Sequence, residues 1–108
     1  MNKEDVKSIK LTTGEEIVGV VHEFNESTVS IQGPFSVART MGSSFMLVPW
    51  MVSIDENDVV DINNSAITAV AETDQQFFDA YVRVITKLES GEDLEEEDNE
   101  VTSSPILH

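Results

Sequence analysis

Residues 9–31 read IKLTTGEEIVGVVHEFNESTVSI, which is three short apolar runs separated by two polar turns. The first turn contains Gly14, and the second spans residues 25–28. The runs alternate apolar with polar residues and are rich in β-branched side chains, as β-strands are. We therefore predict an antiparallel meander of β-strands, with the rest of the chain closing it, covering it or extending from it.

The second of these runs, residues 17–24, carries apolar side chains on both faces of the predicted strand. Its neighbours Ile17 and Val18 point to opposite sides, as successive residues of a strand do. We expect this strand to be covered on both faces. Gly19 in its middle indicates a sharp bend or a close approach of another part of the chain, since glycine otherwise weakens a strand.

The pattern beyond this stretch predicts further strands. A third strand runs to Gly33-Pro34 and continues after a kink through residues 35–38. Residues 45–54, FMLVPWMVSI, predict a strand rather than a helix because Pro49 lies in the middle of the run, where it should mark an edge, a bulge or a bend. Shorter strands are predicted at residues 59–62 and 66–71.

Residues 73–90 predict the one substantial α-helix. Thr73 and Gln76 have the spacing of a capping box, and Asp74 suits the positive end of the helix dipole. Apolar residues then recur at helical spacing, which predicts a face packed against the sheet. These residues are Phe77, Tyr81, Val84 and Leu88. The helix is expected to end near Ser90-Gly91.

The net charge of −15 in 108 residues is unevenly distributed. Residues 91–108 carry seven of the 21 acidic residues and none of the six basic ones. This segment cannot bury enough apolar surface to offset the entropy of ordering, so we predict an acidic disordered tail after one folded domain, residues 1–90. The domain itself is also acidic, which argues against a broad phosphate-binding surface but leaves room for a specific pocket.

Several classes of protein are not expected from this sequence. The chain has no cysteine and no apolar run long enough to cross a bilayer as a helix, which predicts a soluble protein of a reducing cytoplasm. No P-loop, dinucleotide fingerprint or nucleophile elbow is present, so we expect no enzymatic site and no cofactor. The acids of residues 55–61 fail the EF-hand pattern and predict a solvated turn, and His22 has no second ligand nearby, so no metal is expected.

Part of the pattern resembles the Sm and Sm-like (LSm) proteins. The first motif of that family is similar in spacing to Leu11, Gly14, Ile17, Gly19, Val21 and Phe24-Asn25. Its shorter second motif is similar to Ile62, Asn63, Asn64 and Ile67. The resemblance implies a mainly β fold, a strongly bent five-stranded antiparallel barrel-like sheet that assembles edge to edge into a homo-oligomeric ring. It also implies binding of single-stranded RNA, and the helix of residues 73–90 would cover the sheet.

The resemblance further implies where nucleic acid would bind. After its second strand the family offers an Asp, a stacking residue and an Asn, at positions held here by Asn25, Ser27 and Val29. The Arg-Gly pair of its second motif corresponds to Asn63-Asn64. Because these asparagines keep hydrogen-bonding capacity, Asn25, Ser27, Asn63 and Asn64 form a candidate site for single-stranded RNA or DNA.

Other interpretations of these features are also consistent with the sequence. Asparagine is a common turn residue, and Arg39 is either a phosphate contact of the candidate site or the partner of a carboxylate. The missing stacking side chain favours a second hypothesis, a ring-forming adaptor module that no longer binds RNA. A monomer covered by its own helix and loops is the alternative to a ring. Pro105-Ile106-Leu107 ends the tail either as a site for a protein partner or as part of a solubilising end.

Overall fold

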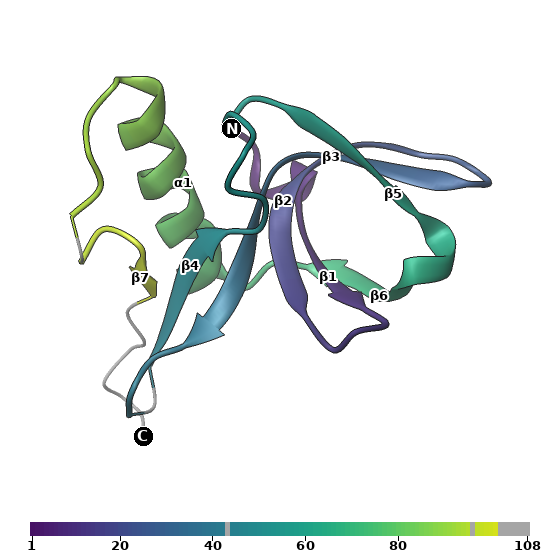
Figure 1. Cartoon of the computed structure of the whole chain (residues 1–108), viewed down its shortest axis with the longest axis horizontal. Coiled ribbons are helices and arrows are strands. Elements are labelled where there is room, and N and C mark those ends of the chain that lie inside the picture. Colours follow the sequence, from purple (N-terminus) through teal and green to yellow (C-terminus); the bar gives the residue numbers. More distant parts are fainter. Residues whose placement is uncertain (43, 96, 102–108) are drawn as a thin grey trace.

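The computed structural model of the chain is mainly β and describes residues 1–42, 44–95 and 97–101. Within these residues it contains a seven-stranded antiparallel sheet and one α-helix (Figure 1). The strands are β1 (Val6–Leu11), β2 (Glu16–Phe24), β3 (Thr28–Arg39), β4 (Phe45–Pro49), β5 (Val59–Asn63), β6 (Ile67–Glu72) and β7 (Glu100–Val101). The helix is α1 (Gln75–Glu89), and short 3₁₀ turns lie at Lys3–Asp5 and Asn64–Ala66.

The sheet is ordered β6-β1-β2-β3-β4-β7, and β5 also pairs with β3. β4 pairs with residues 35–39 of β3, and β5 pairs with residues 28–32 of the same strand. Both therefore lie on the side of β3 that faces away from β2. The sheet is not closed, and it has seven strands instead of five because β4 and β5 are separate strands and β7 adds to β4.

The two faces of the sheet bury separate apolar clusters. The first contains Val6, Val18, Phe35 and Leu47, and α1 packs on it with Ala80, Tyr81, Val84 and Ile85. The second contains Ile9, Leu11, Ile17, Val29, Ile31 and Ile62. Ile17 and Val18 are both fully buried, one in each cluster, which confirms that β2 is covered on both faces. Figure 1 shows α1 on the left, with β4 and β7, and a curved group of strands formed by β1, β2, β3, β5 and β6 on the right.

Gly19 lies where β2 and β3 approach most closely. A Cβ atom at this position would lie 2.7 Å from side-chain atoms of Ile31 and 3.0 Å from the carbonyl oxygen of Gln32. The register between β2 and β3 also shifts between Val18 and Val20, which indicates an irregularity at the glycine. The close approach expected from the sequence is therefore confirmed.

The helix begins differently from the sequence prediction. Asp74, not Thr73, is the N-cap residue, and its Oδ2 accepts a hydrogen bond from the Gln76 N–H at 3.4 Å. The predicted capping box is wrong because Thr73 is buried, where its hydroxyl donates to the Val6 carbonyl at 3.3 Å and contacts the Ser8 hydroxyl at 3.0 Å. Thr73 thus fastens the start of the helix to β1. The helix ends at Glu89, and Gly91 has φ +78°, as the sequence predicted for the helix stop.

The strand predicted over residues 45–54 is shorter in the structure. β4 ends at Pro49, which pairs with Phe35 but has no N–H to continue a ladder. Trp50 makes one last hydrogen bond, from its N–H to the Pro34 carbonyl at 3.1 Å. The chain then leaves the sheet as a loop, residues 50–58, before β5 begins.

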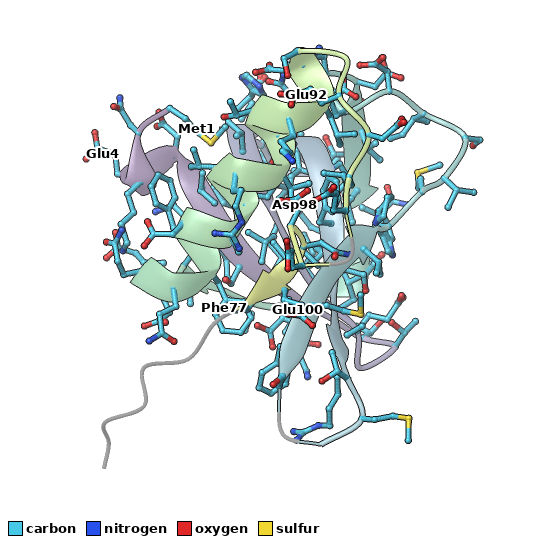
Figure 2. All side chains as sticks on the ribbon, turned by 90° about the vertical axis from the view of Figure 1, so that its left-hand side faces the viewer. Met1, Glu4, Phe77, Glu92, Asp98 and Glu100 are labelled. Carbon is cyan, nitrogen blue, oxygen red and sulfur yellow. The ribbon has the colours of Figure 1, made fainter. Side chains whose placement is uncertain are left out.

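Part of the segment predicted to be a disordered tail is placed against the sheet. Residues 97–101, which we call the strap, lie beside α1 and β4 (Figure 2). Arg83 donates to the carbonyls of Asp98 (3.0 Å) and Glu100 (2.8 Å), and Val101 is buried in the first cluster. The acidic composition did not indicate this, because the strap is held by contacts with residues distant in the sequence, Arg83 and the first cluster. Pro105-Ile106-Leu107 lies outside the described residues.

Asp98 is the polar anchor of the strap. Its Oδ2 accepts from the Glu95 N–H at 2.8 Å and lies 2.9 Å from the Lys87 Nζ. The Glu95 N–H and the Lys87 ammonium hold the pKa of the Asp98 carboxyl below its usual value. The carboxylate therefore stabilises the strap fully above the ordinary pKa of an aspartate, and this contribution is lost as the pH falls through the lower folded value.

We predict that Asp98→Asn loosens the strap and leaves the sheet intact, because it removes the charge that pairs with Lys87. Amide hydrogen exchange should become faster at residues 99–101 and at Leu47, whose N–H donates to the Asn99 carbonyl at 2.7 Å. Asp93→Asn, an exposed change in the same acidic segment, is the matched control. Equal exchange in wild type and Asp98→Asn would contradict the proposed anchoring role.

Candidate functional site

Four of the five predicted site residues meet at one end of the sheet. The turn between β2 and β3 holds Asn25 and Ser27, whereas Asn63 ends β5 and Asn64 begins the 3₁₀ turn that leads to β6. Asn64 joins them, because its N–H donates to the Ser27 carbonyl and its Nδ2 to the Asn25 carbonyl, both at 2.9 Å. Residues nearly forty positions apart in the sequence thus form one pair of loops, which we call the asparagine loops.

Asn25 organises its own turn. Its Oδ1 accepts hydrogen bonds from the N–H groups of Ser27 (2.9 Å) and Thr28 (2.8 Å), and its N–H donates to the Thr28 carbonyl at 3.0 Å. This is an Asx turn, in which the side chain replaces a backbone acceptor. The hydrogen bonds that Asn25 and Asn64 make here are therefore those of turn residues.

Some hydrogen-bonding capacity of the asparagine loops is left over. Within the described residues no hydrogen bond engages Asn25 Nδ2, Asn64 Oδ1, the Ser27 hydroxyl or the Asn63 side chain. Amide donors and acceptors of this kind can match the edge of a nucleotide base without any net charge. These groups are available for hydrogen bonds to a ligand, and the Asx turn fixes the backbone that carries Asn25 and Ser27.

Phe24 adds an aromatic group that the sequence prediction did not include. It ends β2 directly before Asn25, and its side chain is 54% exposed. The family resemblance placed the stacking residue at position 27, where serine stands, and included Phe24 only as an apolar residue of the first motif at the end of the second strand. An exposed aromatic ring next to hydrogen-bonding loops is a stacking surface for a base. Its position before a turn was the signal available in the sequence.

Arg39 is not part of this site. It lies at the far end of β3, eleven residues from Thr28 at the asparagine loops. A strand advances roughly 3.3 Å per residue, so the two ends of β3 are well separated even though the strand bends. The guanidinium carbon lies 4.8 Å from the centre of the Phe45 ring, a cation–π arrangement, and no carboxylate among the described residues pairs with it.

The acidic residues after β4 form a turn, as the sequence predicted. The Asp55 N–H donates to Asp58 Oδ2 at 2.8 Å, and Asp58 donates back to the Asp55 carbonyl at 3.0 Å. Asp61 instead accepts from the Ser30 hydroxyl at 2.6 Å, on the neighbouring strand. In the described parts of the chain, no three histidine or acidic side chains are arranged to hold a metal ion.

Comparison with known proteins adds no assignment. No family model matches the sequence, and no curated protein matches it significantly. None of the helices in residues 1–42, 44–95 and 97–101 has the length and apolar character required to span a membrane.

We predict that Asn25→Ala lowers the free energy of unfolding by about 0.5–2 kcal/mol, the usual cost of losing a side-chain acceptor that caps backbone N–H groups. Asn25→Asp, which keeps the acceptor oxygen, should cost much less. Urea unfolding followed by circular dichroism measures both variants. If the two substitutions were equally destabilising, the Oδ1 hydrogen bonds would not be what holds the turn.

Proposed function

We propose that this chain is a divergent Sm-like protein that assembles with copies of itself into a ring and binds single-stranded nucleic acid, RNA foremost, at the asparagine loops. The observation that carries the proposal is the hydrogen bond from Asn64 Nδ2 to the Asn25 carbonyl. It joins the two segments that the family resemblance separately implicated in binding. Phe24 and the remaining amide groups supply stacking and hydrogen bonds at the same place.

The order of the strands supports the Sm-like part of the proposal. β4 and β5 lie one after the other along the same side of β3, so together they occupy a single strand position. Counted in this way the sheet has five positions, β6, β1, β2, β3 and the combined β4 and β5, with β7 as an addition. This is the number of strands that the resemblance implies.

The edges of the sheet support assembly. β6 has the sequence ITAVAE and pairs only with β1 among the described strands. Its residues Thr68–Glu72 are exposed, and it carries neither lysine nor proline, the residues with which proteins commonly protect an edge strand. On the other side of the sheet, β5 pairs with no described strand except β3, so a second strand edge is unpaired there. A closed ring in which β6 of one copy pairs with β5 of the next would satisfy both edges.

We predict that light scattering gives a multimer of sharp mass for the wild type, and that Val70→Lys dissociates it. A lysine on an edge strand opposes pairing with another copy, and Val70 is 38% exposed on β6. Thr13→Lys adds the same charge in the exposed turn after β1 and should leave the mass unchanged. A monomeric wild type would overturn the ring.

We predict that the protein binds labelled oligo-U or oligo-A with a shallow salt dependence, because the asparagine loops offer hydrogen bonds and a stacking surface but no cation. The slope of log K against log salt should be smaller in magnitude than about 1.5, which corresponds to roughly two phosphate contacts. Asn63→Ala should weaken binding. Asn2→Ala removes an exposed asparagine near the N-terminus and should leave binding unchanged.

A ring-forming adaptor that does not bind RNA is the second candidate function. The observation that favours it is the use of Asn25 Oδ1 and Asn64 Nδ2 in turn structure, which leaves fewer groups for a base. The two functions differ in the oligonucleotide titration: a stable multimer that binds neither oligomer at low salt would assign the chain to the adaptor class. The absorbance ratio of the purified protein, shifted towards 260 nm only if nucleic acid is bound, provides a second reading.

A further inference from the structure

The loop of residues 50–58 interrupts an otherwise continuous strand position. On β3 only Gly33 and Pro34 separate the residue that pairs with Pro49 from the residue that pairs with Val59. Between Pro49 and Val59, opposite these two residues, the chain has nine residues, 50–58. The Trp50 N–H donates to Pro34 at one end of the loop, and the Gly33 N–H donates to Asp58 at the other, both at 3.1 Å.

This loop is held in a defined shape. Besides the two anchoring bonds, Asp55 and Asp58 close a turn within it, and the Asn57 N–H donates to Asp55 Oδ1 at 2.9 Å. Gly33, with φ +57°, allows the loop to lie against β3, because a Cβ atom there would be 2.6 Å from the Glu56 carbonyl oxygen. A surface formed by the loop is therefore largely preformed, which reduces the entropy cost of binding.

An apolar groove lies between this loop, the end of β4 and the C-terminal end of α1, and we call it the loop groove. Its volume is about 210 Å³, and its apolar lining includes Phe35, Pro49, Met51, Val52, Ile54 and Leu88. Val52 is 89% exposed and Met51 39% exposed, so apolar surface continues from the groove onto the outside of the loop. Methionine adapts its shape to a bound group more readily than other apolar residues do.

The size of the loop groove limits what it can hold. A volume of 210 Å³ exceeds the roughly 150 Å³ of an apolar protein cavity that binds benzene. It is smaller than the roughly 300 Å³ at which pockets for small-molecule ligands begin. The groove therefore fits one side chain of the size of leucine or phenylalanine better than a cofactor or a drug-sized metabolite.

The charge around the loop groove is negative. Asp55 and Glu56 line it, and no lysine or arginine does. A hydrogen bond with Asp55, burial, and the negative charges of Asp55 and Glu89 raise the pKa of the Glu56 carboxyl, so its ionised form is disfavoured by its acidic neighbours. A cation next to Glu56 would relieve this repulsion. The acidic segment of the chain itself has the wrong charge to enter here.

We propose that the loop groove docks a short extended peptide of a partner protein, in which one leucine- or phenylalanine-sized side chain enters the groove and flanking lysine or arginine residues face Asp55 and Glu56. The anchor side chain supplies most of the affinity by leaving water, as buried central residues do in other interfaces. The flanking charges set the choice of partner and the rate of association. The loop groove shares no residue with the asparagine loops.

The test uses three fluorescent, end-blocked peptides and the full chain. The probe is Lys-Arg-Leu-Arg-Lys, and its two controls replace leucine by serine or all four basic residues by glutamate. Fluorescence anisotropy measures affinity, and hydrogen–deuterium exchange locates the bound probe. We expect the probe to protect residues 50–58, the serine control to bind about tenfold more weakly or less, and the glutamate control not to bind.

Matched variants of the protein test the two parts of the site. Val52→Ser should weaken probe binding about threefold or more, whereas Met41→Ser, which removes a fully exposed apolar side chain from the β3–β4 hairpin, should have no effect. Glu56→Gln should weaken binding and flatten its salt dependence, and Glu23→Gln on the exposed end of β2 should do neither. These substitutions are at the surface, so the fold is retained.

Three results would overturn the proposal. The first is hydrogen–deuterium exchange of residues 50–58 that does not slow down at a millimolar concentration of the probe peptide. The second is equal binding of the leucine and serine peptides with protection spread over residues 92–100, which would indicate attraction of a basic peptide to an acidic chain. The third is preferential binding of a peptide with the chain's own last seven residues, TSSPILH, which would make a second copy the occupant.

Discussion

The burial of Ile17 and Val18 on opposite faces of β2 is the constraint on which this fold depends. Each side chain is fully buried, and each belongs to a different apolar cluster. Burying a side chain of this size contributes roughly 1.5–3 kcal/mol, so a face with several such residues contributes as much as the net stability of a small domain. Both faces must therefore be covered. The helix α1 covers one, and the curvature of the sheet encloses the other, with Gly19 permitting the close approach of β3.

The curvature of the sheet also explains where its two candidate binding surfaces lie. One half of β3 pairs with β5 and leads to the asparagine loops, and the other half pairs with β4. The two halves meet at Gly33-Pro34, where the outer strand breaks and the loop of residues 50–58 leaves the sheet. The asparagine loops and the loop groove are thus at different places along one bent strand.

Charge distinguishes the two surfaces. Arg83 and Lys87 are engaged by the strap, and Arg39 packs on Phe45, so half of the six basic residues serve the structure of the chain. Any nucleic acid at the asparagine loops must then be held by hydrogen bonds and stacking rather than by phosphate neutralisation. At the loop groove the uncompensated acids favour the opposite kind of partner, a basic one. An acidic protein can bind a nucleic acid and a basic partner only if each binds at its own, spatially separate site.

The sequence by itself determined the features that depend on neighbouring residues. Alternation and turn chemistry located the strands of the meander, the acidic turn at residues 55–58 and the helix with its end at Ser90-Gly91, because these follow from local propensity and side-chain period. The pairing of Asn25 with Asn64 was anticipated only through a family resemblance, since spacing alone does not say which turns meet.

Tertiary contacts decided the rest. Thr73 is buried against β1 instead of capping the helix, and β4 stops at Pro49 although the apolar run continues for three residues, to Val52. Arg83 holds the strap by donating to its backbone carbonyls, and the amino-acid composition of the segment does not predict such a bond. Arg39 is separated from the asparagine loops by the length of β3. Each of these outcomes depends on residues distant in sequence, and the free energy of such contacts exceeds the local preferences from which a single sequence can be interpreted.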